Sequence, residues 1–167
     1  FICQDPSPIL CIQPTLDMAD TWSKDRLAPM IRDTAALSKV ISTGKARDSG
    51  NTLLHKRFLG GHITMAGANS PSSLAARPIR VLLCDEIDRY PASAGAEGDP
   101  ISLAERRTDT FPNAVIIKTS TPTIKDLSKV ENEYNITDKQ EWFTPCPKCG
   151  EFQILAWKNV IWEKDRP

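Results

Sequence analysis

A chain of 167 residues with 40% hydrophobic and 25% charged residues is large enough to bury a core, and it suits one domain or a large part of one. Its 21 basic and 21 acidic side chains balance, which excludes an overall basic field for nucleic acid and leaves only local patches. No apolar stretch approaches a membrane span, the first residues lack a signal-peptide pattern, and five cysteines are an odd count for a disulfide framework. We therefore expect a soluble intracellular protein.

The first predicted elements are a strand and a long helix. The apolar run Ile9–Ile12 is closed by a Gln-Pro-Thr turn, which predicts a buried strand. Thr15 or Asp17 can cap a helix that continues to about Thr34, because apolar residues recur there at helical spacing. Pro29 should kink this helix or break it in two.

A hairpin follows the helix. After a polar loop over residues 42–51, the segments Leu53–Phe58 and His62–Ala66 are predicted to be strands that turn at Gly60-Gly61. Residues 67–78, rich in Ser, Pro and Asn, are expected to form a loop that leads to the next strand.

That strand, Val81–Cys84, runs directly into Asp85 and Glu86. Four apolar residues without polar alternation predict a strand buried on both faces, and open α/β sheets place their ligand crevice at the carboxyl ends of such strands. Two adjacent acids suit a Walker B element, in which the Asp holds Mg²⁺ on the nucleotide phosphates through water and the Glu takes a proton from the attacking water. The same pattern also fits ordinary solvated acids at a strand end.

The remaining elements complete an α/β order. A loop over Pro91–Pro100 precedes a helix over Ile101–Thr110, another buried strand at Ala114–Ile117 and a polar helix over about Asp126–Tyr134. The order strand, helix, hairpin, strand, helix, strand predicts a mostly parallel sheet with right-handed crossovers.

Hydroxyl side chains follow the second buried strand in the segment Ser120–Thr123. If this strand is the neighbour of the one that ends in Asp85 and Glu86, the hydroxyls lie in the same crevice. There they could hydrogen-bond the γ-phosphate of a nucleotide or its attacking water. The alternative is a hydroxyl-rich cap for the following helix.

The end of the chain carries a Cys-Pro-x-Cys-Gly knuckle at Cys146 and Cys149, beside a small β element suggested by Phe152–Leu155 and Val160–Trp162. This knuckle is half of a zinc ribbon, and tetrahedral zinc needs two more ligands. Both histidines are far upstream and the other three cysteines are expected in buried strands, so we expect the missing pair beyond Pro167. The alternative is a reduced turn without metal.

These motifs, in this order, resemble the large subunit of the DNA-packaging terminases of lambda-like phages. The resemblance extends from about Ile9 to Trp157 and includes Asp88 after the acid pair. It implies a P-loop NTPase fold of the RecA-like or terminase type, followed by a small zinc-ribbon-like element. In such terminases an N-terminal ATPase drives double-stranded DNA into a procapsid, and a separate C-terminal nuclease cuts the concatemer.

The resemblance also implies roles, partners and cofactors. Asp85 matches the Mg²⁺-linked Walker B acid, Glu86 the catalytic base, and Ser120, Thr121 and Pro122 the coupling motif. The implied cofactors are ATP and Mg²⁺, with Zn²⁺ possible in the intact protein. The implied partners are double-stranded DNA, the terminase small subunit, the portal and procapsid, and further copies of the chain in a motor in the host cytoplasm, away from membranes.

Two further features concern the completeness of the motor: the role of Arg77 and the absence of a P-loop motif. Arg77 precedes the acid-bearing strand, where packaging ATPases often carry an arginine that reaches a neighbouring subunit's nucleotide; a loop arginine paired with a local carboxylate is the alternative. No G-x-x-x-x-G-K-[ST] occurs, and Ser42–Lys45 offers only a Gly-Lys pair. We therefore expect the P-loop to precede Phe1 and this polypeptide alone to be inactive and to bind ATP weakly or not at all in calorimetry.

The predicted organisation is a partial P-loop ATPase domain over 1–140 and the start of a zinc-ribbon-like element over 141–167. Two other functions fit parts of the sequence. Asp85–Asp88 also matches motif II of a helicase-like translocase, which a second RecA-like domain would favour. A non-catalytic zinc-ribbon module would instead have a complete zinc site within this chain and structural acids.

Overall fold

The computed structural model describes residues 1–41 and 50–162. The chain forms two compact units, Phe1–Glu131 and Asn132–Pro167, which are described separately. The Gly-Lys pair within Ser42–Lys45 and most of the predicted loop over 42–51 lie outside the described residues.

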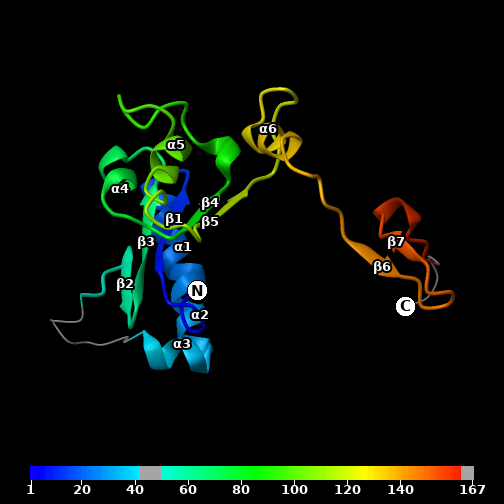
Figure 1. The fold of residues 1–167 in the computed structure, drawn as a ribbon, viewed down its shortest axis with the longest axis horizontal. Helices are drawn as coiled ribbons and strands as arrows, with labels where there is room; N and C mark the ends of the chain where they lie inside the picture. The colour runs from blue at the N-terminus through cyan, green and yellow to red at the C-terminus, as the bar shows by residue number, and fades with distance from the viewer. Residues whose placement is uncertain (42–49, 163–167) are drawn as a thin grey trace. The chain divides into compact units, whose positions relative to one another are not determined.

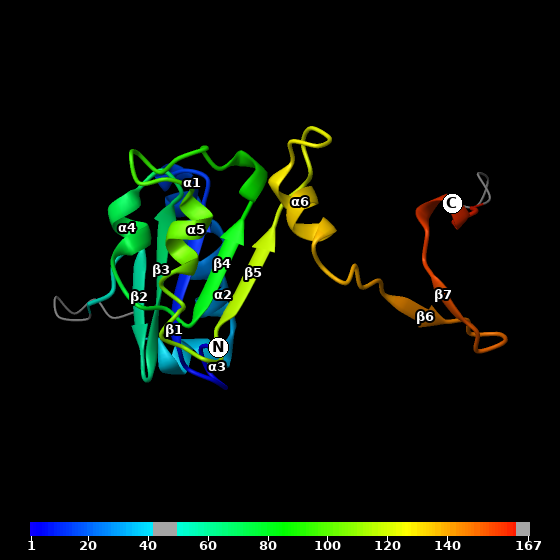
Figure 2. The ribbon, with the colours of Figure 1, turned by 45° about the horizontal axis from the view of Figure 1, so that its top comes forward.

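The first unit is built on a five-stranded sheet in the order β2-β3-β1-β4-β5 (Figures 1 and 2). Strand β1 is parallel to both β3 and β4, β4 is parallel to β5, and β2 is antiparallel to β3. This is the mixed α/β, mostly parallel sheet that the sequence predicted. The strands are β1 (Pro8–Gln13), β2 (His55–Phe58), β3 (Gly61–Gly67), β4 (Val81–Asp85) and β5 (Val115–Thr119).

Helices cover both faces of this sheet, so β1 and β4 are buried on both sides. One core joins Leu10, Ile12 and Leu82 to residues of α4 and α5, and the other joins Ile9 and Val81 to residues of α1 and α2. Alternate residues of a strand point to opposite faces, which is why uninterrupted apolar runs are needed here. The helices of this unit are α1 (Leu16–Trp22), α2 (Ala28–Asp33), α3 (Ala35–Val40), α4 (Pro71–Ala75) and α5 (Pro100–Glu105).

The long N-terminal helix is deformed where proline was expected to disturb it. Of the two predicted caps, Thr15 is the one that caps α1, by accepting a hydrogen bond from the Met18 amide at 3.2 Å. A π-helical turn, Ser23–Leu27, joins α1 to α2, and Pro29 lies in the first turn of α2. Because an amide is not needed in the first turn of a helix, proline is tolerated there. The helix ends at Asp33, close to the predicted Thr34.

Three predictions for the first unit were wrong in detail. The segment 67–78 is not only a loop, because it contains α4. The helix expected over Ile101–Thr110 ends at Glu105. The strand expected to be buried, β5, exposes 41% of Ile116 and 43% of Ile117, because it is the last strand of the sheet among the described residues.

The second unit has little buried surface. Strands β6 (Phe143–Pro145) and β7 (Phe152–Ile154) form an antiparallel hairpin around the cysteine knuckle. A 3₁₀ turn, Trp157–Asn159, follows, and the expected strand at Val160–Trp162 is absent from the described residues. Helix α6 (Lys129–Asn135), close to its predicted position, spans the division between the two units.

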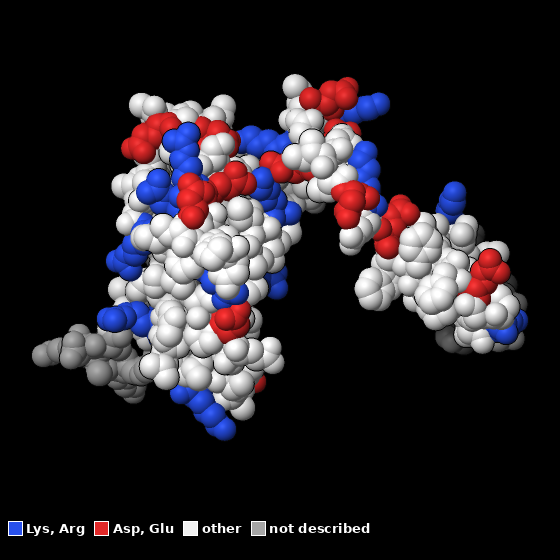
Figure 3. Space-filling model, in the orientation of Figure 1, with Lys and Arg blue, Asp and Glu red and all other residues white. Residues whose placement is uncertain are grey.

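Two surface properties agree with the composition. On the face of the first unit seen in Figure 3, acidic and basic side chains intermingle without an extended patch of one sign. None of the helices in the described ranges has the length and apolar content needed to cross a membrane.

Candidate active site

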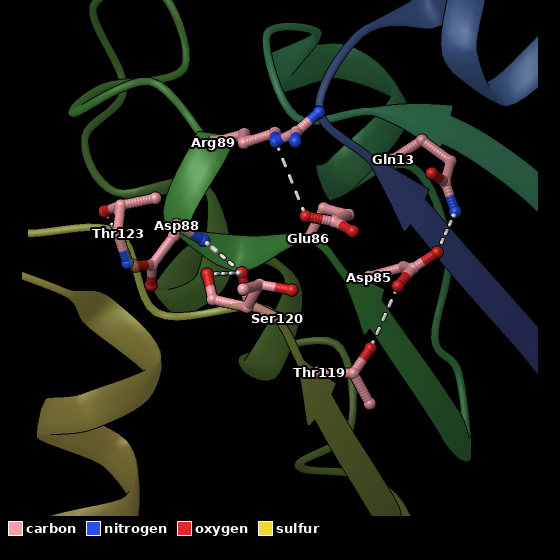
Figure 4. Close-up of polar contacts among 9 residues, drawn as sticks. Gln13, Asp85, Glu86, Asp88, Arg89, Thr119, Ser120 and Thr123 are labelled. Carbon is pink, nitrogen blue, oxygen red and sulfur yellow. Dashed lines mark hydrogen bonds and ion pairs between the residues drawn. The ribbon is translucent and has the colours of Figure 1, made fainter. Parts of the chain in front are cut away.

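Three neighbouring parallel strands end in polar side chains that contact one another (Figure 4). Asp85 is the last residue of β4. The Gln13 side-chain amide at the end of β1 donates to Asp85 Oδ2 at 3.0 Å, and the Thr119 hydroxyl at the end of β5 donates to Asp85 Oδ1 at 3.0 Å. Both carboxylate oxygens are thereby held from opposite sides, which fixes the orientation of this acid.

Glu86 leaves the strand in a strained backbone conformation. Its φ of 56° lies in the left-handed region, which is uncommon for residues other than glycine. Such a conformation costs about 1–3 kcal/mol and persists only where the surroundings impose it. A 3₁₀ turn, Ile87–Arg89, follows directly, and Arg89 Nε lies 3.5 Å from Glu86 Oε2. The turn thus places a second, partly exposed carboxylate beside Asp85.

Asp88 connects the end of β4 to the hydroxyl segment after β5. Its Oδ2 accepts hydrogen bonds from the amide and the hydroxyl of Thr123, both at 2.9 Å, and its Oδ1 accepts one from the Val130 amide at 2.8 Å. In return, the Asp88 amide donates to the Ser120 hydroxyl at 3.2 Å. Burial alone would raise the pKa of Asp88, but hydrogen bonds from Val130, Ser128 and Thr123 outweigh it and lower that pKa to about 2.

A buried tyrosine fastens the same turn to β1. The Tyr90 hydroxyl donates to the Ile12 carbonyl at 2.8 Å, and burial raises the pKa of this phenol above its ordinary value. The turn after β4 is therefore attached to β1 on one side and to the segment after β5 on the other.

The structure brings together some of the predicted site residues and separates others. Asp85, Glu86 and Ser120 lie in one region (Figure 4), whereas Thr121 and Pro122, which follow Ser120 in the chain, are exposed. Arg77 follows α4 and lines a separate cavity with His55 and His62, and none of the strand-end acids lines that cavity. Within this chain, Arg77 therefore lines a different site from Asp85 and Glu86.

Sequence reasoning assigned no individual role to three residues of this network. Gln13 and Thr119 are the last residues of their strands, so their position at the same sheet edge as Asp85 was the available signal. Asp88 was noted only as part of a motif, and its contacts with Thr123 and Val130 are long-range. Such contacts are set by how the two loops fold, which spacing does not predict.

The cysteines divide into buried and exposed groups. Burial raises the pKa of Cys11 and of Cys84 to about 12, so neither offers a thiolate. Cys3 is exposed and lies in no strand, contrary to expectation. Hydrogen bonds from the amides of Cys149 and Lys148 and from the Cys149 thiol lower the pKa of Cys146.

The donor sets fit metals to different degrees. Carboxylate oxygens such as those of Asp85 and Glu86 suit Mg²⁺, which commonly keeps several water ligands. The cysteine pair supplies two soft ligands, as half of a tetrahedral zinc site would. Across residues 1–41 and 50–162, no group of three or more His, Cys, Asp or Glu side chains is arranged to hold a metal ion.

Comparison with known proteins places the chain in a family. The large terminase subunit of Enterobacteria phage P21 is 28% identical to it over 95% of the chain, which spans 26% of that relative. A solved structure of the Thermus phage P74-26 large terminase ATPase domain is 16% identical, with a TM-score of 0.46, over 72% of this chain and 51% of that one. A family model described as phage terminase large subunit gpA, ATPase domain, matches residues 1–167. The chain therefore belongs to the ATPase-domain family of phage terminase large subunits.

Proposed function

We propose that this chain is part of the ATP-hydrolysing motor that drives double-stranded DNA into a procapsid. The observation that carries the proposal is the meeting of the ends of β1, β4 and β5 at Asp85, with Glu86 held in a strained conformation beside it. Family membership supports the ATPase activity, and DNA translocation is the inferred use of it.

Asp85 and Glu86 have different roles in this proposal. When bound, Mg²⁺ neutralises charge on the nucleotide phosphates, and Asp85 would hold it through water. Gln13 and Thr119 keep the Asp85 carboxylate in one orientation, so the acid needs no rearrangement. Glu86 accepts the proton of the attacking water, and its ion pair with Arg89 must loosen for this.

Asp88 supports a path from hydrolysis to movement. A shift of the Glu86 turn would pull on Asp88, which holds Thr123 and the Val130 amide in the first turn of α6. We assign the coupling role to Ser120, Thr121 and Pro122 on this basis, with Asp88 as the residue that connects them to the turn.

The remaining roles concern the wider assembly. We propose that Arg77 acts on the nucleotide of a neighbouring copy, because it lies apart from the acids of its own chain. Cys146 and Cys149 would supply half of a zinc site whose other ligands lie outside the described residues. The terminase small subunit and the portal are the proposed partners, and nuclease activity would belong to another part of the protein.

The decisive experiment replaces Glu86 in the protein that carries this chain. Glu86→Gln should lower ATP turnover at least about 100-fold, because loss of a general base typically costs that much, while ATP binding is retained. Glu97→Gln, an exposed loop glutamate, is the matched control and should turn over normally. Unchanged turnover in Glu86→Gln would remove this residue from catalysis and return the acid pair to a structural role.

A further inference from the structure

A cavity of about 340 cubic ångströms lies where the β2–β3 hairpin meets α4. Leu10, His55 and Thr64 are side by side across three strands, and His62 is two residues before Thr64 on the same face. Helix α4, which lies beside β2 and β3 in Figures 1 and 2, adds Ser72 and Ser73 to the lining. The volume falls within the range of about 300–1,000 cubic ångströms that is usual for small-molecule sites.

This cavity is distinct from the strand-end site. Its residues on β1 and β3 lie toward the middle and the amino-terminal part of those strands, whereas Asp85 lies at a carboxyl end. Leu10, Leu54 and Ile79 give it an apolar wall. A ligand here would therefore touch none of the groups assigned to ATP hydrolysis except Arg77.

None of the described side chains that line the cavity is negatively charged. Two of the polar ones, His62 and Arg77, have a nitrogen without a hydrogen-bond or ion-pair partner among the described residues. His55 Nδ1 is bonded to the Thr64 hydroxyl at 2.8 Å, but the buried His62 Nε2 has no hydrogen-bond partner in the described part of the chain. The two imidazole rings are 5.2 Å apart. Arg77 forms no ion pair with any carboxylate of residues 1–41 and 50–162, and no described Asp or Glu lines the cavity.

The electrostatics of the cavity favour an anion over a cation. Burial is the main cause that lowers the pKa of both His55 and His62, and the nearby Arg77 and Arg57 lower it further. The imidazoles are thus mostly neutral, each with one donor and one acceptor nitrogen, and the cationic guanidinium of Arg77 beside them favours an anion. A buried nitrogen without a hydrogen-bond partner is destabilising, and an oxygen of a ligand would accept a hydrogen bond from the Nε2–H tautomer of His62.

We propose that this cavity binds a small organic oxyanion, a phosphate monoester or a carboxylate carried on an apolar body. Arg77 holds the oxyanion through its forked donors, and His62 Nε2 with the Ser72 hydroxyl supplies further donors. The apolar body packs against Leu10, Leu54 and Ile79. A free inorganic ion would leave this wall uncovered, so the organic part contributes to affinity.

The test is calorimetric titration of the protein that carries this chain, with phenyl phosphate and with benzoate as probes. At least one probe should saturate a single site, and Arg77→Gln should weaken it about 10-fold or more through loss of a charge-assisted hydrogen bond. Arg57→Gln is the matched control, because it removes a nearby charge that does not line the cavity. It should change affinity less than about 3-fold.

A second variant tests the cavity independently, in case Arg77→Gln loses binding because it misfolds. Ala76→Phe places a bulky ring in the cavity from an exposed position on the lining and should abolish binding without removing a charge. Preference for one probe assigns the site to phosphate esters or to carboxylates. Absence of saturation with both probes overturns the proposal, as does binding that survives Ala76→Phe or falls equally in Arg57→Gln.

Discussion

The two units of this chain use similar apolar residues in opposite ways. In Phe1–Glu131, two clusters of buried side chains flank a five-stranded sheet, and Ile12, Val81 and Leu82 have no exposed surface. In the described part of the second unit, residues 132–162, no residue is buried, and Trp142, Trp157 and Ile161 expose 83%, 78% and 93% of their surface.

The difference lies in architecture rather than in composition. A parallel sheet with helices on both faces encloses its strands, whereas a hairpin of three-residue strands has no second layer to cover it. An isolated two-stranded hairpin is at best marginally stable in water. The stability of the second unit therefore depends on something other than its own core, such as the proposed zinc site or contact with another surface.

The largest effect should follow from a cavity in the first unit. Leu82→Ala removes a fully buried side chain of β4 and should lower the free energy of unfolding by about 2–5 kcal/mol. Ile116→Ala on the half-exposed β5 is the control and should cost about 1 kcal/mol. Chemical denaturation of both variants checks this. Equal losses would show that β5 is as fully covered in the whole protein as β4 is here.

A smaller effect should follow from removal of the carboxylate that joins two loops of the first unit. Asp88→Ala leaves the Thr123 and Val130 amides without an acceptor and should cost about 1–3 kcal/mol. Asp88→Asn keeps one acceptor oxygen and should cost less.

The low pKa of Asp88 also predicts a pH dependence. Folding depresses this pKa from 3.8 to about 2, so the stabilisation is complete above pH 3.8 and is lost as the pH falls through about 2. Denaturation curves at pH 5 and pH 2.5 should show a larger loss of stability for the native protein than for Asp88→Asn. Parallel losses would contradict the assignment.

The smallest effect is expected in the second unit. Trp157→Ala, in a side chain that is mostly exposed and stacks loosely on Trp162 at 6.2 Å, should change the unfolding free energy by about 0.5 kcal/mol or less. The same denaturation experiment measures it. A loss of about 2 kcal/mol or more would show that another surface covers these aromatic residues and would remove the contrast between the units.

The sequence was informative where local chemistry decides structure. The apolar runs of β1 and β4, the β2–β3 hairpin and the cap at Thr15, one of two candidates, were predicted correctly, because each depends on neighbouring residues. The hairpin turns at Leu59-Gly60, one residue before the predicted Gly60-Gly61, because Gly61 already pairs with Phe58. Strand β5 was predicted as a strand but wrongly as buried. Its apolar run is the same as that of a central strand, and only its place in the sheet leaves it half-exposed.

The acids of the candidate site could be predicted from the sequence, but the hydrogen bonds and the backbone conformation that hold them in place could not. A strand that ends in Asp85 and Glu86 is recognisable from sequence alone. The hydrogen bond between Gln13 and Asp85 joins residues 72 positions apart, and its existence depends on β1 and β4 being neighbours with matching ends. The left-handed backbone of Glu86 carries no sequence signal either, because glutamate is not a residue that favours it.

That backbone conformation places stability and activity in competition at one position. A glycine at position 86 would adopt a φ of 56° without the strain of about 1 kcal/mol or more that a side chain adds. Selection for stability alone would therefore favour glycine, and Glu86→Gly is expected to fold at least as well while lacking the proposed base. A screen for thermostable variants of this chain would then enrich variants that lack the proposed base, whereas a screen for the proposed ATP hydrolysis would restore the acid.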